Sequence, residues 1–215
     1  MIILDGYNGG GTDFYDSFNR SNGAPGNGWT PSSDAPGIDP VINSNACRFE
    51  IPTAFGKSYL DRVELNSSSN ISVASVTTIG MDFNYVSNSG AAGILGLFLY
   101  YKPFGTSSSD PYFFAEPIDG RVGIAGASTD TPFVITDNTW YSMEMATFKT
   151  GASTVDVFLK VWERSGAKPA AWTVEVVGGV LDKKDEFLRV EHITSTDGTA
   201  PASIVDIDNL FYIET

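Results

Sequence analysis

Residues 16–29 read DSFNRSNGAPGNGW, and this stretch decides the interpretation of the fold. Its first residues, Asp16 to Phe18, indicate a short strand with an apolar anchor. Three glycines and Pro25 follow, which is typical of a turn-rich loop. Trp29 then returns the chain to apolar surface. The stretch therefore predicts an edge strand and a loop that closes onto a hydrophobic core.

The composition of the 215 residues favours strands over helices. Charged residues make up 18% and aromatic residues 13%, with 22 glycines and 11 prolines. Short strands joined by many turns have this composition, and a chain of this length commonly forms one all-β domain. We predict an N-terminal arm or added edge strand over residues 1–13 and a single β-sandwich domain over residues 14–215.

Charge and cysteine content exclude several classes of protein. The formal net charge is -13, which opposes binding to the phosphates of nucleic acid. The single cysteine, Cys47, excludes an internal disulfide and predicts a small core side chain. No stretch approaches the roughly 20 apolar residues of a membrane span, and the N-terminus has no basic region of a signal peptide. We expect synthesis in the cytoplasm and no membrane insertion.

Alternating side chains mark the clearest strands. Residues 81–85 read MDFNY, which predicts a strand in a sheet with one side facing water. Residues 154–163 alternate in the same way and pair with residues 140–148 as a hairpin. In residues 203–213 the alternation assigns four residues to the core face: Val205, Ile207, Phe211 and Ile213.

Shorter apolar runs and turn signals complete the prediction. Further strands are expected at residues 46–51, 92–101, 112–116, 121–125, 172–177 and 186–193. The nearly continuous apolar run at 92–101 predicts burial on both faces, whereas 30–45 predicts a long ordered loop and 182–185 one helical turn. About a dozen short strands without a long helix indicate a two-sheet antiparallel β-sandwich, with a jelly roll as the leading topology.

Three pieces of the chain resemble concanavalin A-like, laminin-G-like jelly rolls of phage virion and bacterial surface proteins. They are DSFNRSNG at 16–23 with GNGWT at 26–30, NTWYSME at 138–144, and VDIDNLF at 205–211. The resemblance implies a sandwich of two curved sheets. It also implies a role in glycan binding or adhesion and, in some branches, glycoside hydrolysis, so function has to be argued from a site.

The residues that catalysis needs are sparse. The hydrolase branch of the resembled family carries a Glu-x-Asp-x-x-Glu pattern that this chain lacks, and Glu144 has no acidic partner two positions away. The single histidine, His192, reads as a half-exposed strand residue, and no Gly-x-Ser-x-Gly motif accompanies it. Spacing for zinc ligands is absent as well. We predict a protein that is not an enzyme.

Calcium is the one metal that the sequence suggests, although no cofactor is required. In jelly rolls the first and last strands lie close together, so Asp16 and Asn19 could approach Asp206, Asp208 or Asn209 and offer hard oxygen ligands. The alternative is that Asp206 and Asp208 face water while Asp16 and Asn19 bind turn amides.

Exposed aromatic residues beside polar groups are the candidates for glycan binding. One set is Tyr100, Tyr101 and Tyr112, near the serine-rich residues 106–110. The other is Phe158 and Trp162, on a strand face with Asp156 and Lys160. The alternatives are that these residues belong to the core or to an interface between subunits.

The leading functional prediction is a non-enzymatic phage virion structural protein on the particle surface, as a capsid decoration, spike or tail-associated protein. Its expected partners are other virion proteins, further copies of itself and surface glycans. A carbohydrate-binding receptor module is the alternative, and a polysaccharide-degrading enzyme is the second alternative.

Overall fold

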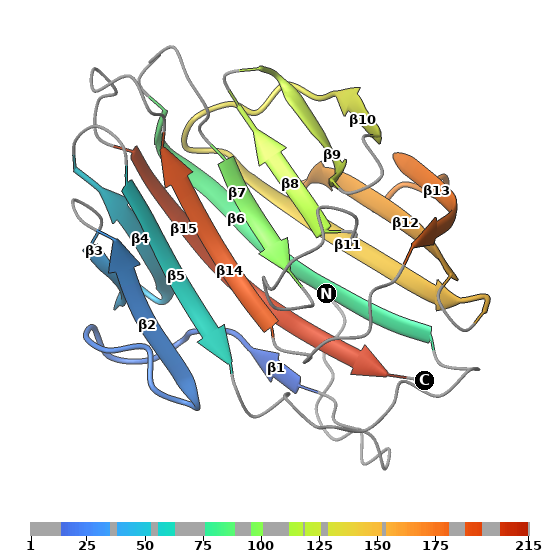
Figure 1. Ribbon diagram of the computed structural model, residues 1–215. Helices are drawn as coiled ribbons and strands as arrows, with labels where there is room; N and C mark the ends of the chain where they lie inside the picture. Colours follow the sequence, from blue (N-terminus) through green and yellow to red (C-terminus); the bar gives the residue numbers. More distant parts are fainter. Residues whose placement is uncertain are drawn as a thin grey trace.

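The computed structural model describes residues 14–34, 38–52, 56–62, 76–88, 96–100, 112–117, 119–125, 129–151, 154–180, 188–194 and 203–214. In these residues the chain forms strands, turns and loops, and the strands make two antiparallel sheets (Figure 1). The predicted arm at 1–13 and helical turn at 182–185 lie outside the described residues. No helix in the described part of the chain is long and apolar enough to cross a membrane.

The first sheet has eight strands in the order β13-β12-β11-β6-β15-β4-β3, with β1 paired to β15. Its strands are β1 (Phe14–Asp16), β3 (Ile38–Asn43), β4 (Ala46–Ile51), β6 (Val76–Asn88), β11 (Trp140–Lys149), β12 (Thr154–Glu163), β13 (Val174–Val180) and β15 (Ser203–Glu214). The first and last strands are therefore neighbours, as the sequence predicted.

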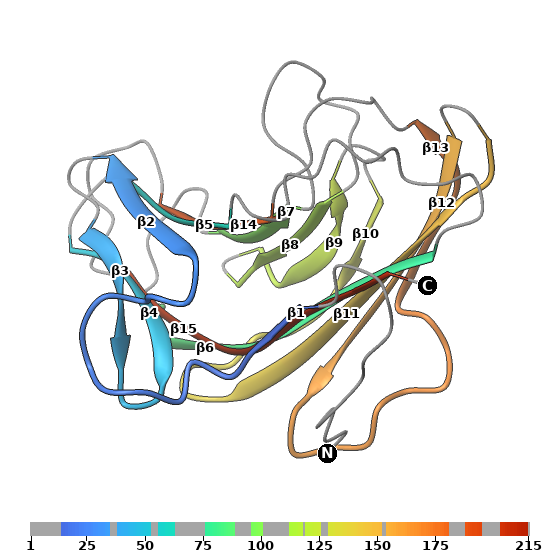
Figure 2. The ribbon, with the colours of Figure 1, turned by 90° about the horizontal axis from the view of Figure 1, so that it is seen from below.

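The second sheet has seven strands in the order β10-β9-β8-β7-β14-β5-β2. They are β2 (Trp29–Asp34), β5 (Gly56–Arg62), β7 (Gly96–Tyr100), β8 (Tyr112–Glu116), β9 (Arg121–Ala125), β10 (Thr129–Pro132) and β14 (Leu188–Thr194). Figure 2 shows the eight-stranded sheet curving around the seven-stranded one.

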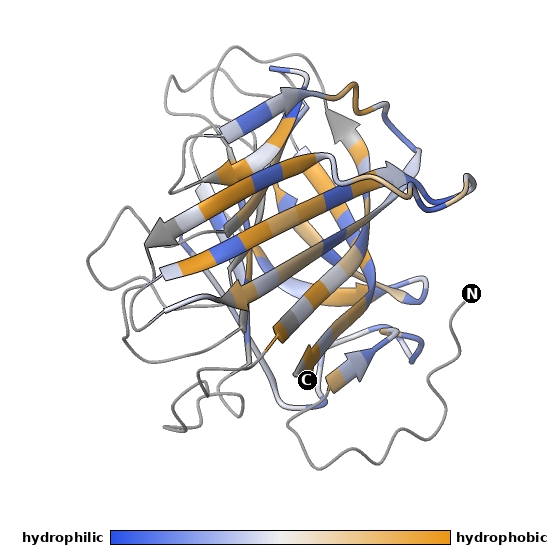
Figure 3. Ribbon diagram, turned by 90° about the vertical axis from the view of Figure 1, so that its right-hand side faces the viewer, coloured by the Kyte–Doolittle hydropathy of each residue, from blue (hydrophilic) through white to orange (hydrophobic). Residues whose placement is uncertain are grey.

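The hydrophobic core fills the space between the sheets. Hydrophobic and hydrophilic residues alternate along the strands (Figure 3), and in β12 every second residue from Val155 to Val161 is buried. The predicted anchors join this core, since the rings of Phe18 and Trp29 lie 5.9 Å apart between centroids. Cys47 is buried, as predicted.

The prediction of a loop over residues 30–45 is wrong. Two strands, β2 and β3, occupy most of this segment, and each is the edge strand of one sheet. Edge strands tolerate Pro and polar residues because the backbone groups on one side of the strand make no hydrogen bonds to a neighbouring strand. The alternating exposure of β2 agrees with a strand whose outer residues face water.

The prediction of which residues of β15 face the core is correct only for the first half of the strand. Val205 and Ile207 are buried, but beyond them the buried residues are Leu210 and Tyr212. The ladder to β6 shifts register between Asp208 and Phe211, where Asn209 has a φ of 49°. A bulge adds one residue to a strand, so every side chain after it changes face.

Two exposure predictions also fail. Asp82 and Asn84 of β6 are 9% and 7% exposed, although they were expected on a wet face. They lie in the middle of the eight-stranded sheet, where side chains from β11 and β15 flank them. His192 is fully buried rather than half-exposed, and its Nε2 lies 3.0 Å from the Ser203 hydroxyl between the two sheets.

A substitution at Gly80 of β6 tests the packing of the eight-stranded sheet. A Cβ at this position would lie 2.5 Å from the Phe211 ring and 2.6 Å from the Met143 carbonyl oxygen. We expect Gly80→Ala to lower the free energy of unfolding by about 2 kcal/mol, because the backbone cannot yield without disturbing the ladder.

Thermal and denaturant unfolding of the two proteins measure this change. The matched control is Gly166→Ala in an exposed turn, where the new Cβ would lie 3.2 Å from the nearest atom, and we expect it to cost much less. Equal unfolding midpoints for wild type and Gly80→Ala would contradict the packing described here.

Candidate functional site

The outer face of the seven-stranded sheet carries a group of charged and aromatic side chains on β2, β5 and β14. In β5, Ser58 and Leu60 point into the sandwich, which places the residues between them on the outer face. Because β14 pairs with β5 in register, Arg189 lies opposite Asp61 and Glu191 lies opposite Tyr59. We call this group the Arg189 cluster: Asp34, Lys57, Tyr59, Asp61, Arg189 and Glu191.

Arg189 is held by two contacts at once. Its Nε and Nη2 donate to the two Asp61 carboxylate oxygens at 2.6 and 2.7 Å. Its guanidinium carbon lies 4.7 Å from the centroid of the Tyr59 ring. A bidentate ion pair on an aromatic ring fixes both the position and the plane of the guanidinium.

The rest of the cluster keeps Tyr59 neutral. Its hydroxyl donates to Asp34 Oδ2 at 2.9 Å, and burial together with this bond raises the pKa of Tyr59 above its usual value. On the same face, the Lys57 ammonium lies 3.4 Å from Glu191, whose side chain is 1% exposed. The cluster thus offers a fixed guanidinium, a neutral phenol and carboxylates.

A second group on the same face resembles the first. Arg121 donates from Nε to Glu116 at 2.6 Å and from Nη1 to Asp130 at 2.8 Å, and its guanidinium carbon lies 5.6 Å from the Phe114 ring centroid. Asp119 lies within 3.4 Å of the same guanidinium. Burial raises the pKa of Glu116. We call these five residues the Arg121 cluster.

Two of the tyrosines predicted to bind glycans, Tyr100 and Tyr112, belong to this sheet. The backbone of Tyr100, the last residue of β7, lies opposite Arg189 in the ladder between β7 and β14. Tyr112, the first residue of β8, lies opposite Ala125 of β9. Tyr101 and residues 106–110 lie outside the described residues. The structure thus places one predicted residue beside a charged cluster that the sequence reasoning missed.

Strand register explains why this cluster was missed. Residues 59–61 and 189–191 alternate between polar and apolar, but Ser58 and His192 interrupt the pattern, so the available signal was weak. The charged partners, however, can be far apart in the sequence, since 128 positions separate Asp61 from Arg189. A sequence pattern cannot show which strands are neighbours.

The other predicted aromatic pair lies on the outer face of the eight-stranded sheet. Phe158 packs against Trp172, with ring centroids 5.4 Å apart, and the Lys160 ammonium lies 4.4 Å from the Trp172 centroid. The Lys168 ammonium lies 5.9 Å from the Trp162 centroid and pairs with Glu144. Phe158 and Trp162 therefore lie on a different sheet from Tyr100 and Tyr112, and neighbouring side chains already contact both residues.

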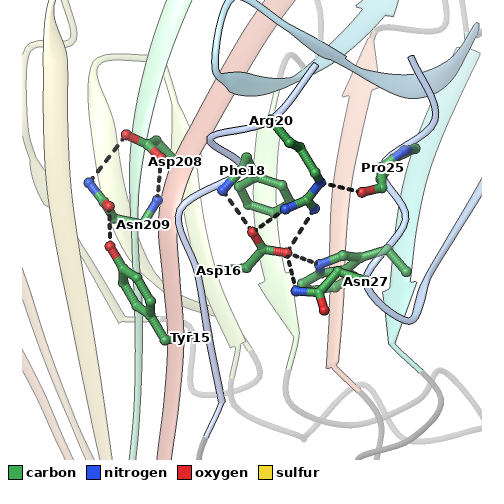
Figure 4. A network of polar contacts seen from close by, with 9 residues as sticks. Tyr15, Asp16, Phe18, Arg20, Pro25, Asn27, Asp208 and Asn209 are labelled. Atoms are coloured by element: carbon green, nitrogen blue, oxygen red, sulfur yellow. Dashed lines mark hydrogen bonds and ion pairs between the residues drawn. The ribbon is translucent and has the colours of Figure 1, made fainter. Parts of the chain in front are cut away.

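Asp16, a predicted calcium ligand, is the centre of a hydrogen-bond network (Figure 4). Its Oδ1 accepts from the Phe18 amide and from Arg20, both at 2.7 Å. Its Oδ2 accepts from Arg20 at 2.9 Å, Asn27 at 3.0 Å and the Trp29 indole at 2.8 Å. Burial alone would raise the pKa of Asp16, but these hydrogen bonds outweigh it and lower the pKa.

The remaining predicted calcium ligands have separate partners. Arg48 binds Asp206 with two bonds of 2.7 and 2.8 Å, and Asn209 donates its amide to Asp208 at 2.8 Å. Asn19 is exposed. Among the described residues, no three His, Cys, Asp or Glu side chains gather as metal ligands would. The arrangement of Asp16, Asp206 and Asp208 does not fit one shared ion, and calcium binding stays a prediction.

Comparison with solved structures identifies the fold. Lectin II from Ulex europaeus superposes with a TM-score of 0.59 at 10% identity, covering 94% of this chain and 98% of that one. A PL-14 alginate lyase from Aplysia kurodai gives 0.55 at 13% identity, covering 86% and 87%. Lectin I-B4 from Griffonia simplicifolia gives 0.57 at 10%, covering 95% and 100%.

These identities show the fold alone, which is the concanavalin A-like jelly roll shared by lectins and alginate lyases. The predicted fold class is confirmed. No protein-family model matches the chain, and no curated protein matches its sequence.

The network around Asp16 predicts a sensitivity to acid. Because the folded-state pKa of Asp16 is lowered, its contribution to stability is complete above the unfolded pKa of about 3.9 and is lost as the pH falls through the folded value. We expect Asp16→Asn to lower the free energy of unfolding at pH 7 by about 2 kcal/mol. Urea unfolding from pH 7 to pH 2 should show this difference shrinking below about pH 4.

Asp208 provides a contrast of opposite sign. Burial raises its pKa, so the folded state prefers the protonated carboxyl and gains stability from this group as the pH falls. We expect the deficit of Asp208→Asn relative to wild type to grow in acid, where that of Asp16→Asn shrinks. Parallel pH profiles for the two variants would contradict this assignment of the shifts.

Proposed function

We propose that this protein binds carbohydrate through the outer face of the seven-stranded sheet and does not transform it. The observation that carries the proposal is the Arg189 guanidinium, fixed by Asp61 and stacked on Tyr59. Planar charged groups suit sugar hydroxyls because they make paired, directional hydrogen bonds. A side chain already held in place loses little conformational entropy when a ligand binds.

The fold supports this choice without deciding it. One structural neighbour is the Ulex lectin UEA-II in complex with galactose, with a TM-score of 0.55, and others are alginate lyases. Carbohydrate is the common ligand class of these neighbours, whereas catalysis is not common to them. The choice between binding and catalysis therefore has to come from the side chains of this chain.

The chemistry of the Arg189 cluster favours binding over catalysis. A general base has to accept a proton near its operating pH, but the phenol of Tyr59 has a raised pKa and donates to Asp34. A glycosidase needs one carboxylate as an acid and one as a base or nucleophile. Here Asp61 is bound by Arg189, and Glu191 is buried beside Lys57.

The location at which the protein acts in the organism stays a prediction. A position on the surface of a phage particle, with virion proteins or further copies of the chain as partners, was predicted from the sequence. None of the matching proteins named above is described as a virion protein. A carbohydrate-binding receptor module is the more economical proposal, and it is compatible with a role in adhesion.

Replacement of Arg189 tests the proposal. On an array of neutral and acidic glycans we expect wild-type protein to bind at least one glycan, and Arg189→Met to bind it at least tenfold more weakly. Loss of hydrogen bonds to a charged group, worth about 1.5 to 3 kcal/mol, gives a change of this size.

The matched control is Arg48→Met. Arg48 makes the same bidentate pair across two strands, with Asp206, but on the eight-stranded sheet. It should lose a similar amount of stability and keep full glycan affinity. The proposal is overturned if wild type binds no glycan on the array, or if Arg189→Met binds as tightly as wild type.

A further inference from the structure

A continuous row of opposed residues crosses the whole seven-stranded sheet. Each member lies directly opposite the next in the strand ladders, from β2 at one edge to β10 at the other. In order along the row the residues are Ser32, Tyr59, Glu191, Phe98, Phe114, Gly123 and Asp130. The row therefore runs perpendicular to the strands.

Two aromatic rings in this row each lie against an arginine. Arg189 stacks on Tyr59 and Arg121 stacks on Phe114. Tyr59 on β5 and Phe114 on β8 are separated by three strand spacings, which is about 14 Å at the usual distance between strands. The same arrangement of ring, guanidinium and carboxylate thus occurs twice on one face, at a separation greater than one sugar ring.

Gly123 makes room for the second ring. A Cβ at this position would lie 2.7 Å from Phe114 Cζ and 2.5 Å from the Thr129 carbonyl oxygen. The Phe114 ring therefore lies over Gly123, along the row, and Arg121 covers it. Phe114 is only 7% exposed, but it does not belong to the hydrophobic cluster between the sheets, which contains Phe113 instead. The second cluster is thus a feature of the outer face.

The charge of the two clusters selects between classes of carbohydrate. Six carboxylates meet three cations, and each cation lies within ion-pair distance of one or more of the carboxylates. The carboxylates belong to Asp34, Asp61, Glu116, Asp119, Asp130 and Glu191, and the cations to Lys57, Arg121 and Arg189. The whole chain has a net charge of -13. An anionic polysaccharide would meet repulsion at this face, whereas hydroxyl groups would find both donors and acceptors.

We infer that the two clusters are subsites for one uncharged oligosaccharide chain that lies across the strands, along the row from Tyr59 to Phe114. This inference rests on the proposed function and adds the length and charge class of the ligand. The Arg189 cluster binds one sugar unit, and the Arg121 cluster binds a unit farther along the same chain.

Varying the length of the sugar chain tests the inference. The uncharged probes are glucose, galactose and mannose, each as the monosaccharide and as a β-linked hexamer. A mannuronate hexamer is the anionic probe. By titration calorimetry we expect one neutral hexamer to bind at least tenfold more tightly than its monosaccharide. We expect Arg121→Met to remove about tenfold of that affinity while leaving the affinity for the monosaccharide unchanged.

Arg164→Met is the matched control. Arg164 also stacks on an aromatic ring, Trp140, at 5.3 Å and contacts two carboxylates, but it lies in the turn after β12 of the eight-stranded sheet. Its side chain is 41% exposed, against 40% for Arg121. This variant should bind the hexamer like wild type. Asp130→Asn, at an exposed carboxylate that Arg121 contacts, is a milder second variant and should weaken only the hexamer.

The outcomes separate this inference from the proposed function. Equal affinity for hexamer and monosaccharide, an unchanged hexamer affinity in both Arg121→Met and Asp130→Asn, or strongest binding of the mannuronate hexamer would overturn the inference while leaving carbohydrate binding intact. Failure of wild type to bind any of these sugars, together with an empty glycan array, overturns both.

Discussion

The buried carboxylate of Asp16 is the interaction on which the rest of the structure depends. It accepts five hydrogen bonds, and the one from the Trp29 indole positions the first residue of β2. β2 pairs with β5 along its whole length, and β5 carries Tyr59 and Asp61. A single negative charge at the end of β1 therefore fixes the edge of the sheet on which the Arg189 cluster is built. Burying that charge is tolerable only because so many donors surround it.

Arginines and carboxylates occur on the outer faces of both sheets, but they have different roles there. On the eight-stranded sheet, Arg48 binds Asp206, and Arg164 lies close to both Asp82 and Asp208, which face each other across the ladder. These arginines neutralise carboxylates that are mostly buried, and so they hold neighbouring strands together. On the seven-stranded sheet, Arg121 and Arg189 also pair with carboxylates, but the rings that they contact lie in one row that crosses the sheet. Position in the ladders, rather than residue type, separates a structural pair from a candidate binding group.

The fold does not decide the function, because the same jelly roll occurs in lectins and in alginate lyases. The Arg189 cluster has an ordered guanidinium and a phenol that keeps its proton. Its carboxylates Asp61 and Glu191 lie beside cations, and Asp34 accepts the hydrogen bond of the phenol. Such groups can bind hydroxyls with little reorganisation, but they cannot easily transfer protons. This combination supports the proposal that the protein recognises a sugar without cleaving it, and it depends on contacts between strands rather than on any motif.

The sequence by itself determined the architecture and the principal anchors of this protein. The period of two in β12, the hairpin of β11 and β12, and the return of Trp29 to the core are local patterns, and local steric and hydrophobic preferences are enough to produce them. Only the tertiary structure decided the rest. It put β2 and β3 at sheet edges, changed the face of Leu210 through the bulge at Asn209, and brought Asp61 beside Arg189. Register and strand order depend on the packing of distant segments, which no local pattern encodes.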